Sequence, residues 1–96
     1  MRVNVRRCIL DGQTVTSMER FYDELTRQLP FPRHFGRNLD ALWDVLTVDL
    51  PGPVELTWEK AALSRKAMGG DYELLVELLR EAAEERGDLK VFIQMH

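Results

Sequence analysis

The chain has 96 residues, of which 45% are hydrophobic and 30% charged, with a formal net charge of −3 and an isoelectric point near 5.3. This composition is typical of one soluble globular domain, residues 1–96, and it argues against direct binding of nucleic acid, which needs a basic face. Because there is no apolar run near the roughly 20 residues of a membrane span, no secretory signal and only one cysteine, we expect a cytoplasmic protein without disulfides.

The first half of the chain is predicted to contain one strand and two helices. A strand from near Val3 to Leu10 ends at the turn residues Asp11-Gly12. Thr16 to Glu19 has the form of a capping box, and apolar residues at helical spacing predict a helix from about Ser17 to Gln28. Two prolines stop this helix, and Asn38 is a suitable N-cap for a second, shorter helix.

The second half is predicted to contain a strand, two helices and a last strand. Val54 to Trp58 alternates between apolar and polar residues, which indicates a strand with one buried face. A short helix from about Lys60 to Met68 follows, Asp71 can cap the last helix, and Leu89 to Gln94 forms the third strand. The last helix has an inward apolar face and an outward acidic one, made respectively of Leu74, Leu75, Leu78, Leu79 and Ala82, and of Glu73, Glu77, Glu81, Glu84 and Glu85.

The element order β-α-α-β-α-α-β predicts an α/β fold with a three-stranded parallel sheet. Strands that are separated by helical crossovers pair in parallel, and their connections are right-handed. The helices are too few to cover both faces of the sheet thoroughly. We therefore expect one face to be partly open.

The most informative segment runs from Phe31 to Leu46, where a proline-stiffened loop leads into the second helix. Asp40 and Asp44 lie one turn apart on this helix and repel each other by roughly 0.2–0.5 kcal/mol. Trp43 lies beside them, and its spacing allows either a core position or a contact position. Such a surface is suited to a cationic partner, although acidic helices are often simply solvated faces.

The distribution of charge also favours a basic protein as the partner. Up to Arg37 the chain has seven arginines against four acids, whereas from Asn38 onward six basic residues face twelve acidic ones. Complementary fields of this kind speed the encounter of two proteins.

Catalytic and metal-binding chemistry is poorly represented. Cys8 and His34 could form a thiol–imidazole pair, but Cys8 lies in an apolar strand, where cysteine usually acts as a small buried hydrophobe. General acid–base catalysis by Asp40 and Asp44 is conceivable, but a convex helix surface offers no pocket for a substrate. The two histidines, His34 and His96, lack the spacing of metal ligands. We therefore expect no catalytic residue, no metal and no cofactor.

The string from His34 to Asp44, His-Phe-Gly-Arg-Asn-Leu-Asp-Ala-Leu-Trp-Asp, is very similar to the signature of the barstar family of ribonuclease inhibitors. The resemblance covers nearly the whole chain, through flanking motifs at residues 9–12, 29–32, 56–58 and 80–82. It implies the barstar-like three-layer α/β/α arrangement around a parallel sheet. It also implies tight, one-to-one, non-covalent inhibition of a small, basic, extracellular or toxin-type ribonuclease.

The resemblance further implies which residues bind the nuclease. Asp44 would be the main mimic of an RNA phosphate, Asp40 would take a second basic contact, and His34 would pack on the catalytic histidine of the nuclease. The other contacts would come from Asn38, Leu39, Trp43, Thr47 and Glu81. After Thr47 the type inhibitor has Gly-Trp where this chain has Val48 and Asp49, which favours a partner other than barnase.

The implied biological role is that of an antitoxin or immunity protein that protects its own cell. A non-inhibitory adaptor, which would use the same fold and acidic helix to bind another basic protein, is the alternative. An enzyme is a third class, and it would show turnover that depends on Cys8, His34 or an aspartate.

Overall fold

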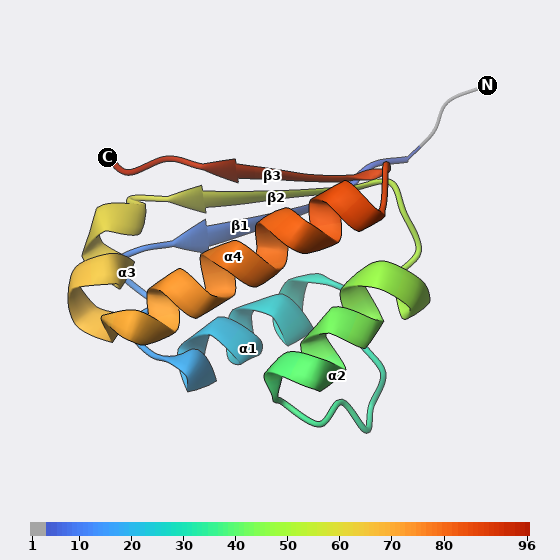
Figure 1. Ribbon diagram of the computed structural model, residues 1–96, viewed down its shortest axis with the longest axis horizontal. Coiled ribbons are helices and arrows are strands. Elements are labelled where there is room, and N and C mark those ends of the chain that lie inside the picture. The colour runs from blue at the N-terminus through green and yellow to red at the C-terminus, as the bar shows by residue number, and fades with distance from the viewer. Residues whose placement is uncertain (1–3) are drawn as a thin grey trace.

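A three-stranded parallel sheet and four helices make up residues 4–96, the part of the chain that the computed structural model describes (Figure 1). The predicted α/β class, element order and parallel pairing are confirmed. The predicted strand start near Val3 lies outside the described residues. The element bounds are β1 Arg6–Asp11, α1 Met18–Gln28, α2 Leu39–Asp44, the π-helical turn η1 Val45–Asp49, β2 Val54–Glu59, α3 Ala61–Met68, α4 Gly70–Glu85 and β3 Leu89–Ile93.

The helices α1, α2 and α4 lie on one side of the sheet (Figure 1). The strand order is β1-β2-β3, so both right-handed crossovers advance in the same direction and place their helices on the same face. α1 contacts β1, α4 contacts β3, and α2 packs on α4. The helices α1, α2 and α4 therefore lie on one side of the sheet, whereas the three-layer α/β/α arrangement that the resemblance implies has helices on both sides.

The opposite face of the sheet is open, as the small number of helices predicts. Ile9 and Phe92, which point to this face, are 50% and 45% exposed. Thr57 lies between them in the strand register and is half-buried. None of the helices in residues 4–96 is long and apolar enough to cross a membrane.

The core lies between the sheet and the helices and is centred on Trp58. Trp58 is fully buried and packs with ring centroids 5.5 Å from Phe21 and 5.2 Å from Tyr72. Its indole Nε1 donates a hydrogen bond of 2.9 Å to the hydroxyl of Ser64, which is also buried. The polar atoms of this central pair are thus satisfied without water.

Helix ends differ from the predictions at two places. Ser17, and not Thr16, caps α1, because its hydroxyl accepts the N–H of Arg20, so the expected capping box with Glu19 does not form. Asp71 lies inside α4, which begins at Gly70 after Gly69, whose φ is positive at 62°.

The expected inward face of the last helix is only partly correct. The buried stripe of α4 is Tyr72, Leu75, Leu79 and Ala82. Leu78 is half-buried and Leu74 is 49% exposed, because Leu74 lies on the flank of that stripe which turns toward α2. The outward glutamates are exposed, as predicted.

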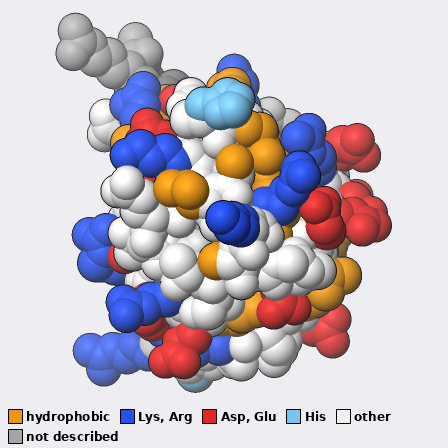
Figure 2. Space-filling view, turned by 90° about the vertical axis from the view of Figure 1, so that its left-hand side faces the viewer, with side chains coloured by type: hydrophobic (Ala, Val, Ile, Leu, Met, Phe, Trp, Pro, Cys, Tyr) orange, Lys and Arg blue, Asp and Glu red, His pale blue; other side chains and the backbone are white. Residues whose placement is uncertain are grey.

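Charge is unevenly distributed on the face of the molecule at the end where α3 lies. There Lys and Arg side chains are more numerous along the left margin, and Asp and Glu side chains along the right margin (Figure 2). The right margin is the side that faces the viewer in Figure 1, where α4 carries its glutamates. The charge on this face is thus uneven, with the acidic side where α4 lies.

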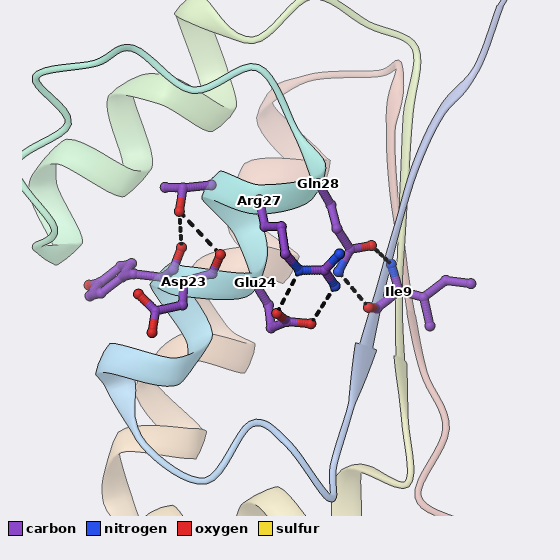
Figure 3. A network of polar contacts seen from close by, with 7 residues as sticks. Ile9, Asp23, Glu24, Arg27 and Gln28 are labelled. Atoms are coloured by element: carbon purple, nitrogen blue, oxygen red, sulfur yellow. Dashed lines mark hydrogen bonds and ion pairs between the residues drawn. The ribbon is translucent and has the colours of Figure 1, made fainter.

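The outer edge of β1 is covered by a side chain (Figure 3). The backbone N–H of Ile9 donates to Gln28 Oε1, and Gln28 Nε2 donates to the carbonyl of Ile9, both at 2.8 Å. This is the pairing that a neighbouring strand would make. Beside it, Arg27 forms two hydrogen bonds with Glu24. The Gln28 amide therefore protects an edge that could otherwise template the pairing of another chain.

Replacing Gln28 with Ala is expected to free this edge. Hydrogen exchange at the Ile9 amide should become faster, stability should fall by about 1 kcal/mol, and light scattering at high protein concentration should rise. Gln13→Ala is the matched control, because Gln13 is exposed in a turn and its amide pairs with no strand. Equal protection of the Ile9 amide in the wild type and the Gln28 variant would contradict this role.

Candidate functional site

The second helix begins at a well-formed cap. Asn38 Oδ1 accepts the N–H of Ala41 at 2.8 Å, and Asn38 Nδ2 donates to the carbonyl of Gly36 at 3.3 Å, so the predicted N-cap is confirmed. A Cβ at Gly36 would lie 3.2 Å from that amide nitrogen, so a larger residue would crowd the cap. The cap fixes the position at which Asp40 enters the first turn.

The loop before α2 is fixed by aromatic packing and an ion pair. Phe35 packs edge-on against Phe31 and Tyr22, with centroids 4.8 and 5.5 Å apart. Arg37 has φ of 49°, and its guanidinium bonds the carboxylate of Asp23 on α1 at 2.7 Å. Because both ends of the loop are held, its exposed side chains are presented on a firm support.

Asp40 and Asp44 are both exposed on α2. Within residues 4–96 neither carboxylate forms an ion pair or accepts a side-chain hydrogen bond, so the fold does not use them. Trp43 and Leu39 are half-buried beside them and pack against the core. Trp43 thus combines the two roles that its spacing allowed: part of its side chain packs against the core, and part remains accessible to solvent.

Two hollows flank α2. One, of about 140 Å³, lies between α2 and the preceding loop and is lined by His34, Phe35, Asp44 and Asp49 together with backbone and small residues. The other, of about 290 Å³, lies between α2 and α4. Its lining has an apolar part and an acidic part, made respectively of Leu39, Trp43, Leu74 and Leu78, and of Asp40, Glu77 and Glu81.

The structure therefore groups the predicted site residues around one helix. His34 and Asp44 both line the first hollow, and Asp40 and Glu81 both line the second. Asn38 and Thr47 line neither hollow. Asn38 caps the helix, and the Thr47 hydroxyl donates to the carbonyl of Trp43 at 2.7 Å.

Glu77 and Leu74 join the site although the sequence did not place them there. Asp49, which the comparison with the type inhibitor had already singled out, lines the first hollow. Asp49 does so because residues 45–49 form a π turn, in which a residue lies close to the one five positions earlier. Short π segments often occur at functional sites, but a sequence period of 3.6 does not reveal them. The helical spacing of the leucines predicts Leu74 in the core. In the structure it is 49% exposed and lines the second hollow.

The site offers an anionic surface and little catalytic chemistry. Cys8 is fully buried in β1, and burial raises the pKa of its thiol to about 12, while His34 is exposed in the loop before α2. The two side chains do not form the nucleophile pair considered from the sequence. In residues 4–96 no group of three or more His, Cys, Asp or Glu is arranged to hold a metal ion.

Comparison with known proteins shows the family of this chain. A family model described as "Barstar (barnase inhibitor)" matches residues 5–95. This chain belongs to the barstar family. A relative from Bacillus subtilis (strain 168), named "Putative ribonuclease inhibitor YrdF", is 35% identical to it over 91 residues, which cover 94% of this chain and 100% of that protein. The family resemblance of the segment from His34 to Asp44 is thus confirmed over almost the full length of the chain.

Proposed function

We propose that this barstar-family protein inhibits a small basic ribonuclease by seating α2 and the preceding loop in the active site of the nuclease. The observation that carries the proposal is the state of Asp40 and Asp44, which are exposed and form no ion pair within residues 4–96, on a helix whose cap and preceding loop are held in place. A nuclease active site must hold RNA phosphates with cationic side chains. Two fixed carboxylates can occupy the same positions.

Asp44 is assigned the role of the main phosphate mimic, and Asp40 that of a second basic contact. Two opposite charges about 4 Å apart attract by roughly 4 kcal/mol at an effective dielectric of 20, and desolvation offsets much of this. Because neither carboxylate forms an ion pair within residues 4–96, binding breaks no ion pair there. The cost at the two carboxylates themselves is the removal of their water, in addition to the entropy that any association loses.

The surrounding residues are assigned to specificity and packing. His34, which shares a hollow with Asp44, is positioned to stack on an imidazole of the nuclease. Leu39 and Trp43 supply partly exposed apolar surface of the kind that anchors interfaces. Glu81 adds a charge at the rim of the second hollow. Asn38 and Thr47 contribute to binding indirectly, because their hydrogen bonds stabilise α2, and directly through those of their atoms that remain accessible.

This assignment defines a non-catalytic role in the cytoplasm, as an antitoxin or immunity protein in a one-to-one complex. The uneven distribution of charge on the molecule supports it, because an acidic face attracts a basic nuclease and speeds encounter. Val48, which is 76% exposed, and Asp49 then make the rim of this inhibitor distinct from that of the type inhibitor.

Titration of nuclease activity tests the proposal. Small basic proteins that co-purify from the source cells with the wild type, and not with Asp44→Ala, are assayed on a fluorogenic RNA. Activity should fall linearly and vanish at one equivalent of inhibitor. A complex that forms at the same stoichiometry but leaves RNA cleavage intact would indicate the adaptor function instead.

A further inference from the structure

We propose that Arg86 is a positioning residue for the acidic face, because it holds the end of the helical segment that carries Asp44 and Asp49. Its effect on binding rests on the proposed function. Its effect on the free protein does not.

The end of η1 leaves the carbonyl of Leu46 without a partner in the helical ladder. In η1 the N–H of Leu50 donates to the carbonyl of Val45 at 2.8 Å, a step of five residues. The ladder then stops, because Leu50 is extended, with ψ of 121°, and Pro51 has no N–H. The carbonyl of Leu46 therefore needs a donor from elsewhere in the protein.

Arg86 supplies that donor from a distant part of the chain. Its Nη1 donates to the carbonyl of Leu46 at 2.9 Å, across 40 residues of sequence. Arg86 is the C-cap residue of α4, so this bond joins the end of one helix to the end of another. A hydrogen bond from a charged donor is stronger than a neutral one, so the contact is a substantial tether.

The guanidinium is itself held in place. Its Nε and Nη2 donate to the two carboxylate oxygens of Asp88 at 2.6 and 3.3 Å, and the Arg86 side chain is only 12% exposed. The same pairing lowers the pKa of Asp88. A Cβ at Gly52 would overlap both the Asp88 carboxylate and the Arg86 guanidinium, so a side chain at this position would have to displace the pair.

Asp44 and Asp49 consequently lie on a segment with two anchors. The cap of Asn38 holds its N-terminal end, and Arg86 holds its C-terminal end. Loss of Arg86 leaves the carbonyl of Leu46 without its charged donor, so the π turn is free to loosen. Asp49 and Val48 would then shift relative to Asp44, and the first hollow would lose its fixed shape.

Three variants test this role: Arg86→Ala, Arg86→Lys and the matched control Arg27→Ala. Arg27 is exposed and pairs with Glu24 on α1, so its removal changes net charge equally without touching η1. In the free protein, hydrogen exchange at residues 47–50 should be about tenfold faster in Arg86→Ala, partly restored in Arg86→Lys and unchanged in Arg27→Ala.

The second measurement is the dissociation rate of the complex with the cognate ribonuclease, at a temperature where every variant is folded. It should rise about tenfold in Arg86→Ala and remain unchanged in Arg27→Ala. Loss of a positive charge alone would favour a basic partner, so weaker binding cannot be a charge effect.

Unchanged exchange at residues 47–50 in Arg86→Ala would overturn the proposal. So would faster exchange combined with wild-type dissociation, because Arg86 would then serve only the stability of the turn. If the wild type inhibits no ribonuclease, the inhibitory function fails, and the exchange data on the free protein still decide whether Arg86 fixes the segment.

Discussion

Asp44→Ala is expected to weaken inhibition of the cognate ribonuclease by roughly 30-fold to several thousand-fold. Truncating one partner of a buried charge pair at an interface costs about 2–5 kcal/mol, a range that draws on measurements with barstar itself, and each 1.4 kcal/mol is about tenfold. Much of this cost arises because the cationic group of the nuclease is left buried without a counter-charge. The inhibition constant of the purified variant gives the measurement.

The same substitution should leave the fold intact. Asp44 is exposed and forms no ion pair within residues 4–96, so the free energy of unfolding should change by less than about 0.5 kcal/mol. Removal of the repulsion from Asp40 could even raise stability by about 0.2–0.5 kcal/mol. A large loss of stability with inhibition retained would instead make this carboxylate structural.

Glu59→Ala is the matched control for the loss of one negative charge. Glu59 follows Trp58 on β2, so its side chain points to the open face of the sheet, away from α2. It should slow association slightly through the change in net charge and leave dissociation unchanged. An equal loss of inhibition in both variants would mean that overall charge, and not position on α2, determines binding.

Local patterns in the sequence were sufficient for much of the fold and of the site. Asn38 could be predicted as the N-cap because its side chain and its position directly before an apolar helical pattern are enough to identify a cap. Asp40 and Asp44 could be placed on one face because residues four apart in a helix always share a face. The parallel pairing follows from the element order alone. The family signature is also continuous in sequence, from His34 to Asp44, so the sequence alone identifies the family.

Features that depend on distant parts of the chain could not be predicted. The second hollow needs α2 and α4 to meet, so Leu74 and Glu77 enter the site only through packing. The π turn that brings Asp49 toward Asp44 has no local signature. Arg86 reads in the sequence as an ordinary basic residue at a helix end, because its partner carbonyl is 40 residues away.

The second large effect is expected at the core. Trp58→Ala should lower the free energy of unfolding by about 3–5 kcal/mol, through loss of buried aromatic surface and the cavity that remains. The hydroxyl of Ser64 would also lose its indole donor, which adds about 1 kcal/mol. Denaturant unfolding measures the change. Phe92→Ala, at an aromatic residue that is 45% exposed on the open face, should cost far less and serves as the control.

Trp58→Ala should therefore lower stability without changing the affinity of the folded protein for the nuclease, whereas Asp44→Ala should weaken inhibition without lowering stability. A domain of this size has about 5–15 kcal/mol of stability, and Trp58→Ala loses about 4–6 kcal/mol of it, so its folded fraction must be measured under the conditions of the inhibition assay. Trp58 lines neither hollow, and the folded fraction should inhibit the nuclease with wild-type affinity once its concentration is corrected for unfolding. If inhibition by the folded fraction falls as steeply as stability, the acidic face depends on the core beneath it, and the separation of binding surface from scaffold does not hold.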